Sequence, residues 1–255
     1  MSSKIKLSER MQTIADHIRE DDRTADIGTD HGYIPIYLIS SGITDRVILT
    51  DINEGPLAKA AANFEHYLPG FKPDLRIGDG LSAVSPGEAD DIIIAGMGGI
   101  LISKILARGS ETASKAGMLI LQPRNHSSSL RHFLRNNENF TIVSEEIAVE
   151  DRRFCEIITA KRTGLLNSRE KETESIVKEL EKKLGFSEKI YDELPVMYAL
   201  TGKYRDYLDY KCRLEQLVID NINENGRSAH AEAGKKRAEE RLSAFSEIRK
   251  AAGHK

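Results

Sequence analysis

The segment from Thr24 to Pro35, TADIGTDHGYIP, holds the residues that most directly suggest chemistry. A strand-like run at 24–27 leads into a turn that contains Gly28 and Gly32, and an apolar helix is predicted to begin at Tyr33. Proteins of the α/β class use this succession of strand, glycine turn and helix to bring backbone N–H groups close to a nucleotide-like ligand. The segment therefore predicts a ligand-binding turn, although an ordinary connection between a strand and a helix uses similar residues.

The spacing of the small residues distinguishes between two kinds of nucleotide-like ligand. A dinucleotide fingerprint, G-x-G-x-x-G, requires glycine at positions 28, 30 and 33, but this chain has Asp30 and Tyr33 at the last two. Asp26, Gly28 and Gly32 instead form acid-x-G-x-x-x-G, the pattern of the first motif in methyltransferases that use S-adenosylmethionine (SAM). SAM carries no pyrophosphate, so the turn needs a close approach of the backbone but no complete phosphate cradle.

Polar residues also follow the next strand-like runs, where ligands of open α/β sheets bind. Asp51 comes 25 residues after Asp26, and its carboxylate is suited to accept hydrogen bonds from two ribose hydroxyls. Asp79 follows the third run, where an adenine amino group is expected, and Met97 follows the fourth, where it could line an adenosyl pocket. The predicted cofactor contacts are Asp26, Gly28, His31, Asp51, Ile52, Asp79, Gly80, Gly96 and Met97.

The fourth strand-like run ends in the segment 96–99, GMGG, which contains no ionisable side chain. Methyltransferases that act on amino groups often carry an Asn/Asp-Pro-Pro-aromatic turn at this point. The segment therefore supplies no general base and favours a nucleophile with its own free lone pair, such as a ring nitrogen. Positioning and desolvation are then the main catalytic requirements. The three glycines also suit a tight turn between a strand and a helix, and the two interpretations are compatible.

Candidate catalytic and substrate-binding residues lie beside the glycine turn and after the fifth strand-like run. Tyr33 could stack on a nucleobase or pack in the core, and Asp30 could contact the base or cap the following helix. The segment 122–126, QPRNH, offers amide and cationic groups to a base or a phosphate, or it forms a polar loop whose serines at 127–129 cap the next helix. The predicted catalytic residues are Asp30, Tyr33 and Asn125, and the predicted substrate contacts are Arg124, His126, Arg131 and Arg153.

The elements that position these residues alternate between strand and helix up to Arg162. Apolar residues at helical spacing predict a first helix over 7–18 with Ser8 as its N-cap. The other predicted strands are 47–50, 74–77, 91–95 and 117–121, and the predicted helices between and after them are 56–67, 100–108 and 130–137. Two further strands, 140–149 and 153–160, are close enough to form a hairpin. The expected fold is α/β, the Rossmann-like sheet of class I SAM methyltransferases with an antiparallel terminal hairpin.

The character of the sequence changes after Arg162, where strand signals end and charged residues with helical periodicity follow. We expect antiparallel helices in a coiled-coil-like module. Their apolar stripes are Ile176, Val177, Leu180 and Leu184, then Leu200 to Val218, then Ala238 to Ile248, with Pro195 between the first two helices. We therefore predict two domains, a SAM-dependent methyltransferase domain over 1–162 and a helical domain over 163–255.

The composition limits the partners. The net charge is −3, with 19 basic and 23 acidic residues up to Arg162 and 18 and 17 after it, so any RNA surface has to be a local patch. Cys155 and Cys212 have no CxxC partners, so we expect no metal site and no disulfide. The sequence shows no signal region and no apolar run as long as a membrane span. These features predict a cytoplasmic protein without a membrane partner, as a monomer or weak dimer.

At the motifs named above the chain resembles a known family. ADIGTDHGYIP, the segment EGP at 54–56 behind Asp51, GDGL at 78–81, IAGMGG at 94–99 and LQP at 121–123 are similar to the TrmK family. These are bacterial SAM-dependent tRNA (adenine-22-N1)-methyltransferases. The resemblance implies a Rossmann-like catalytic domain followed by a coiled-coil domain, and methyl transfer from SAM to N1 of adenine 22 in the D-arm region of tRNA. N1 of adenine has a free lone pair, in agreement with the absence of a base at 96–99.

Two other functions remain open from the sequence. The near-neutral charge also suits a SAM-dependent methyltransferase that acts on a small molecule or a protein, with the helical tail as a dimerising or lid element. The glycine-rich segment at 96–99 also permits a non-catalytic module that binds SAM as a structural or sensed ligand. Methyl incorporation into tRNA would distinguish the expected function from both.

Overall fold

Short runs rich in isoleucine, leucine and valine form the strands of one mixed sheet. The computed structural model describes residues 5–184, 188–194, 204–226 and 228–252. Its strands are β1 (Thr24–Ile27), β2 (Val47–Asp51), β3 (Asp74–Ile77), β4 (Asp91–Gly98), β5 (Met118–Asn125), β6 (Phe140–Glu150) and β7 (Arg153–Arg162).

The sheet has the strand order β3-β2-β1-β4-β5-β7-β6. Neighbours among β1 to β5 are parallel, whereas β7 runs antiparallel to both β5 and β6. This arrangement confirms the predicted Rossmann-like sheet with an antiparallel terminal hairpin. β4 lies at the centre, and residues 91–94 of this strand are buried on both faces, as expected for its continuous apolar run.

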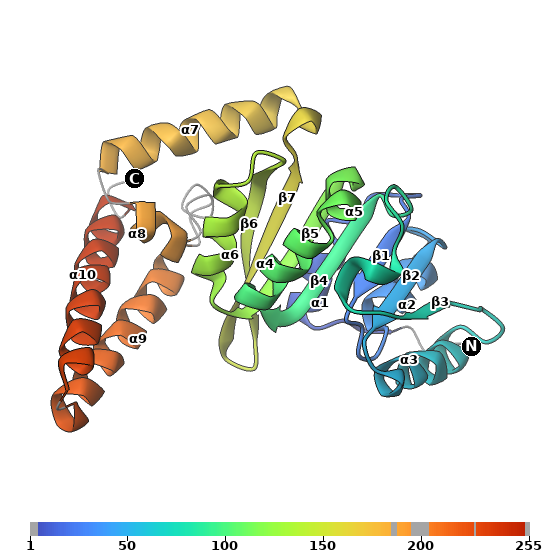
Figure 1. Ribbon diagram of the computed structural model, residues 1–255, viewed down its shortest axis with the longest axis horizontal. Helices are drawn as coiled ribbons and strands as arrows, with labels where there is room; N and C mark the ends of the chain where they lie inside the picture. The colour runs from blue at the N-terminus through green and yellow to red at the C-terminus, as the bar shows by residue number, and fades with distance from the viewer. Residues whose placement is uncertain (1–4, 185–187, 195–203, 227, 253–255) are drawn as a thin grey trace. The chain divides into compact units, whose positions relative to one another are not determined.

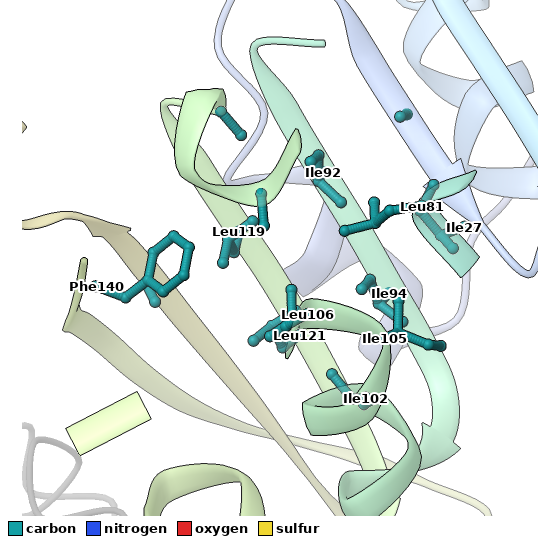
Figure 2. Packing of buried hydrophobic residues seen from close by; sticks show 14 of the residues in the cluster. Ile27, Leu81, Ile92, Ile94, Ile102, Ile105, Leu106, Leu119, Leu121 and Phe140 are labelled. Atoms are coloured by element: carbon teal, nitrogen blue, oxygen red, sulfur yellow. The ribbon is translucent and has the colours of Figure 1, made fainter. Parts of the chain in front are cut away.

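Helices cover both faces of this sheet (Figure 1). One face packs against α1 (Glu9–Ala15), α2 (Tyr33–Ser40) and α3 (Glu54–Tyr67). The other packs against the 3-10 turn η1 (Gly80–Ala83), α4 (Gly99–Arg108), α5 (Ser110–Lys115) and α6 (Ser127–Arg135). Figure 2 shows Ile102, Ile105 and Leu106 of α4 facing the buried side chains of β4 and β5. This packing fixes the positions of the strand ends relative to the helices that follow them.

Three details differ from the sequence prediction. β4 and β5 extend to Gly98 and Asn125, beyond their predicted ends at 95 and 121, because the two strands stay paired across the glycine-rich segment. The short helix α5 was not predicted, since it has only two buried residues, Thr112 and Ala113. Ser8 caps α1 as predicted, and its side chain accepts a hydrogen bond from the backbone N–H of Met11.

The chain after β7 is helical. It contains the 3-10 turn η2 (Thr163–Leu165) and the helices α7 (Ser168–Leu184), α8 (Glu188–Glu193), α9 (Tyr204–Asn225) and α10 (Ala229–Ala252). α9 and α10 are antiparallel, because Arg241 pairs with Glu215 at 2.7 Å and Arg249 pairs with Asp209 at 2.9 Å. Tyr207, Leu208 and Phe245 are buried in this helical unit, which confirms the predicted C-terminal helices.

The chain forms two compact units, residues 1–174 and 175–255, so the division lies within α7. The domain boundary predicted at 162/163 coincides with the end of β7 and stays a prediction. Pro195, predicted to separate the first two helices, and Leu200, predicted to begin the second apolar stripe, lie outside the described residues. In the described part of the chain, no helix combines the length and apolar character needed to cross a membrane.

Arg131 is a structural residue in the interior, so its prediction as an RNA contact is wrong. Its side chain is 1% exposed. Its Nε lies 2.5 Å from Glu145 Oε1 and its Nη2 lies 2.5 Å from Glu156 Oε2, so the cation on α6 is paired with carboxylates of β6 and β7. A buried guanidinium needs such partners, because desolvation of an unpaired charge is costly.

Replacing Arg131 with leucine should destabilise the protein by about 3–5 kcal/mol, because the two glutamates would lose their buried cation. Arg135→Ala on the exposed side of the same helix is the matched control, and we expect it to cost less than about 1 kcal/mol. Urea denaturation followed by circular dichroism measures both. Equal losses in the two variants would contradict the structural role of Arg131.

Candidate cofactor and active site

The parallel register brings the predicted residues of β1, β2 and β4 to one edge of the sheet. Ile27 of β1 is paired with Thr50 of β2 on one side and with Ile94 of β4 on the other, so the turns that follow start at the same level. The backbone N–H of Gly28, after β1, donates to the Thr50 carbonyl of β2 at 2.8 Å. The backbone N–H of Gly78, after β3, donates to the Asp51 carbonyl of β2 at 3.0 Å. The carboxyl ends of β1, β2 and β3 are therefore joined by backbone hydrogen bonds.

Gly28 and Met97, both predicted cofactor residues, are in direct contact. Gly28 has a φ of +76°, and a Cβ at this position would lie 2.0 Å from Met97 Cε. A side chain on residue 28 would therefore displace the methionine and strain the backbone. Gly96, with a φ of +77°, precedes Met97 at a break in the register between β4 and β5. The glycines let the methionine reach the first turn.

Asp51 and Asp79, the predicted nucleoside contacts after β2 and β3, each interact with another group of the protein. The Asp51 carboxylate accepts a hydrogen bond from the Asn53 backbone N–H at 2.8 Å, which fixes its orientation. The next residue, Ile52, is 60% exposed, an apolar side chain placed beside the carboxylate. Asp79 pairs with Arg108 of α4 at 2.9 Å, a partner that the sequence did not indicate. Gly80 has a φ of +60° and packs against Ile105 of the same helix.

Asp30, His31 and Tyr33 form one cluster at the start of α2. The rings of His31 and Tyr33 are stacked, with centroids 5.2 Å apart. Asp30 lies 3.1 Å from His31 Nε2 and 3.3 Å from Lys59 Nζ of α3. Asp30 does not cap α2, because the N-cap is Gly32 with a φ of +67°, so that alternative is wrong. Tyr33 packs on the core and on His31, and both residues are half-buried.

Asn125 and His126, at the end of β5, lie against the glycines at the end of β4. Asn125 Oδ1 and His126 Nδ1 are 2.9 Å apart. A Cβ on Gly98 would lie 2.9 Å from Asn125 Oδ1, and one on Gly99 would lie 2.2 Å from the His126 carbonyl oxygen. His126, with a φ of 52°, is the N-cap residue of α6, and none of the serines at 127–129 holds that position. Asn125 and His126 are thus placed beside the GMGG segment.

The predicted cationic contacts have different environments. Arg124 is exposed at the end of β5. Arg153 is exposed at the start of β7, in the hairpin turn. Because β7 runs antiparallel to β5, this turn lies at the same edge of the sheet as Arg124. Arg131, as described above, is buried away from any such surface. Among the described residues, no group of three or more His, Cys, Asp or Glu side chains could hold a metal ion.

Sequence reasoning missed the residues that hold this edge together. Gln122, assigned to a polar turn, is buried and bonds to the Gly96 backbone N–H at 3.1 Å. Lys59 of α3 reaches Asp30, and Arg108 of α4 reaches Asp79. These partners are separated by 26 to 29 residues in the chain, and no local pattern marks them. The one available signal was that Lys59 and Arg108 lie within predicted helices, where a cationic side chain is expected to be exposed.

Burial controls the charge of Asp26. This carboxyl group lies within β1 and is 8% exposed, and desolvation raises its pKa to about 6, while the nearby Thr29 side chain opposes the shift. Asp26 therefore lies inside the sheet, two residues before Gly28. The carboxylate form is disfavoured in the folded protein relative to the unfolded chain.

The contact between Gly99 and His126 predicts a specific intolerance to added volume. Gly99→Ala should destabilise the protein by about 1–3 kcal/mol, because the new methyl group would force the His126 backbone to move. Gly55→Ala in α3 is the matched control, since nothing lies within 4 Å of its added Cβ. We expect that control to gain up to about 1 kcal/mol from helix propensity. Thermal denaturation compares them, and similar melting temperatures would contradict this packing.

The raised pKa of Asp26 predicts a pH dependence of stability. The folded protein retains the Asp26 proton up to about pH 6, whereas the unfolded chain releases it near its ordinary value of 3.8, so this group's contribution to stability falls as pH rises between these values. Asp26→Asn removes the effect. Its stability relative to the wild type should therefore increase by up to about 3 kcal/mol between pH 4 and pH 7. Urea denaturation at several pH values measures the difference, in which contributions of other groups cancel, and a constant difference would contradict the shift.

Comparison with known proteins identifies the family to which the chain belongs. Residues 7–158 match the family described as methyltransferase domain. The chain is 37% identical over 159 residues to the tRNA (adenine(22)-N(1))-methyltransferase of Bacillus subtilis (strain 168), an alignment that covers 62% of this chain and 66% of that enzyme. The curated relative is therefore matched over slightly less than two thirds of its length.

Solved structures extend the similarity. The crystal structure of the B. subtilis M1A22 tRNA methyltransferase TrmK has a TM-score of 0.76 and 28% identity, covering 96% of this chain and 99% of that one. Streptococcus pneumoniae Sp1610 in complex with S-adenosyl-L-methionine has a TM-score of 0.70 and 25% identity, covering 96% and 100%. The predicted resemblance to TrmK is confirmed, and the chain belongs to the methyltransferase domain family.

Proposed function

We propose that the protein transfers a methyl group from SAM to N1 of adenine 22 in the D-arm region of tRNA. The similarity to the B. subtilis tRNA (adenine(22)-N(1))-methyltransferase supports this function. The observation that carries the proposal is the end of β4. There the GMGG segment contributes no ionisable group, yet it contacts the first glycine turn through Met97 and the Asn125–His126 pair through Gly98 and Gly99.

The residues at the edge of the sheet fit SAM. The oriented Asp51 carboxylate is an acceptor for ribose hydroxyls, and the exposed Ile52 beside it offers an apolar surface to an adenine ring. Gly28 and Gly96 allow the backbone to approach a ligand closely. We assign cofactor binding to the predicted set, Asp26, Gly28, His31, Asp51, Ile52, Asp79, Gly80, Gly96 and Met97.

When bound, SAM supplies an electrophilic methyl group on a positively charged sulfur. Adenine N1 has a lone pair available for this carbon, so the protein need not remove a proton before transfer. The chain's own residues then have to orient the base and exclude water. Asn125 has an amide group for the base edge. The stacked His31–Tyr33 pair offers an aromatic surface, with Asp30 next to it.

We propose that the tRNA backbone contacts the exposed cations at the same edge of the sheet. Arg124 and Arg153 flank the site from β5 and from the β6–β7 hairpin, and His126 lies between Arg124 and α6. The domain over 1–162 would hold the catalytic site, and the helical domain over 163–255 would add RNA contacts. Because the net charge is slightly negative, these local cations have to supply the attraction to phosphate.

The test is methylation of unmodified tRNA by the purified protein with SAM, followed by mass spectrometry of the released nucleosides. We expect N1-methyladenosine, and we expect none when adenine 22 of the transcript is replaced by guanosine. Methylation that persists on the replaced transcript would contradict the assigned position. Methyl transfer only to small molecules or proteins, or SAM binding without turnover, would contradict the tRNA function.

Asp51→Ala should weaken SAM binding by about 10- to 100-fold, since it removes a charge-assisted hydrogen-bond acceptor for the ribose. Asp45→Ala is the matched control, because Asp45 is an exposed carboxylate that precedes the opposite end of the same strand. Isothermal titration calorimetry measures both affinities. An Asp51 variant that binds as tightly as the Asp45 variant would contradict the assigned role.

A further inference from the structure

Gln122 of β5 is a buried amide whose polar atoms are all directed to specific partners near the site. Gln122 is 2% exposed. Its Oε1 accepts hydrogen bonds from the Gly96 backbone N–H at 3.1 Å and from Arg10 Nη1 at 3.3 Å. Its Nε2 donates to the Pro123 carbonyl at 2.9 Å. A buried glutamine with this many partners specifies a particular local geometry.

The Gln122 side chain accepts the hydrogen bond of the Gly96 backbone N–H, for which the β4–β5 pairing offers no partner residue. The register of β4 with β5 passes from Ala95–Gln122 to Met97–Pro123, so Gly96 has no paired residue in this ladder. Proline has no backbone N–H, which further weakens the ladder at this point. The glutamine side chain supplies the acceptor for Gly96 and a donor for the Pro123 carbonyl. It therefore holds the bulge in which Gly96 adopts a φ of +77°.

The bulge determines where Met97 lies. The Met97 ε-methyl group occupies the space where a side chain on Gly28 would be, so a shift of the Gly96 backbone would move it out of contact with the first turn. Gln122 itself lies inside the sheet and does not reach that turn. It acts on the site through the backbone of β4.

The same network continues to two other elements. Arg10 of α1 bonds to Gln122, and its Nε lies 2.7 Å from Glu150 Oε2 at the end of β6. Glu150 is paired with Arg153 across the hairpin, whose turn contains Asp151 and Arg152, both with positive φ. One chain of contacts thus joins the hairpin that carries Arg153 to the Gly96–Met97 bulge.

We propose that Gln122 is a positioning residue that holds the Gly96–Met97 bulge against the Gly28 turn, and that Arg10 connects this bulge to the β6–β7 hairpin. The inference rests on the proposed function, since it concerns the same site. It extends that function by assigning the geometry of the cofactor edge to a buried amide and an arginine from the first helix, neither of which is assigned to contact the cofactor.

The test combines a structural probe with cofactor affinity. The five methionines of the chain are labelled with ¹³C at the ε-methyl group, and the Met97 signal is assigned with Met97→Leu. Gln122→Leu removes the acceptor for Gly96. We expect the Met97 resonance to shift and broaden, and the Kd for S-adenosylhomocysteine to rise by about tenfold. Gln122→Glu retains the acceptor for Gly96 and loses only the donor to the Pro123 carbonyl, so it should change both values less than Gln122→Leu does.

Thr159→Val is the control for the loss of a buried polar group, because Thr159 is 1% exposed and lies in the same sheet on β7. It should leave the Met97 resonance and the affinity unchanged. Arg10→Met tests the network from its less buried end and keeps the experiment decisive if Gln122→Leu does not fold. We expect this variant to shift the Met97 resonance less and to raise the Kd by about threefold.

The outcomes separate this inference from the proposed function. An unchanged Met97 resonance in Gln122→Leu, or in Arg10→Met if the leucine variant does not fold, would overturn the inference whatever the tRNA assay shows. Equal effects of Gln122→Leu and Thr159→Val would also overturn it. A wild-type protein that does not methylate tRNA would overturn the proposed function, while the Met97 resonance would still decide the role of Gln122.

Discussion

The parallel pairing of β1 with β2 and β4 is the constraint on which the candidate site depends. Each of these strands contributes only a few residues to the site, and those residues are far apart in the sequence. The pairing of Ile27 with Thr50 and with Ile94 starts their turns at one level, and buried apolar side chains on both faces of β4 hold that register. A shift by one residue would place the buried face of a strand in the wrong layer, so the core and the site are specified together.

The second requirement is that neighbouring segments approach the backbone closely. Glycines make this possible, each opposite a specific group. Gly28 accommodates Met97, whereas Gly99 accommodates the carbonyl of His126. The end of β4 is therefore fixed between the first turn and the end of β5. Such a segment needs no ionisable group to be functional, since it contributes shape and backbone groups to the site. This property suits a reaction in which the nucleophile brings its own lone pair.

Charge at this edge is organised by local pairing. Asp30 lies between His31 and Lys59, Asp79 pairs with Arg108, and Arg10 links Gln122 to Glu150. The cationic partners Lys59, Arg108 and Arg10 lie on helices, so these charges orient side chains at the strand ends and turns more than they set an overall field. The two buried ionisable residues, Asp26 and Arg131, differ in how burial affects their charge. Asp26 is disfavoured as a carboxylate by desolvation, whereas Arg131 keeps its charge because two glutamates accompany it.

The sequence alone determined most of the element types, the sheet class, the strand–glycine–helix succession at 24–35 and the family resemblance. These features are local, because hydrophobic periodicity, glycine spacing and carboxylates at strand ends can each be recognised within about ten residues. It also indicated that Gly28, Asp51 and Met97 belong together, through the rule that parallel strands present their carboxyl ends at one edge.

The tertiary structure alone decided which polar residues face the site and which serve the fold. Arg131 and Gln122 are both polar residues near the end of β5 in sequence, yet one pairs with glutamates in the interior and the other bonds to the Gly96 backbone. Arg10 and Glu150 meet across 140 residues of chain. Such contacts depend on how helices pack on the sheet, and the free energy of burying a charge or an amide depends on its partners in space, which no local spacing specifies.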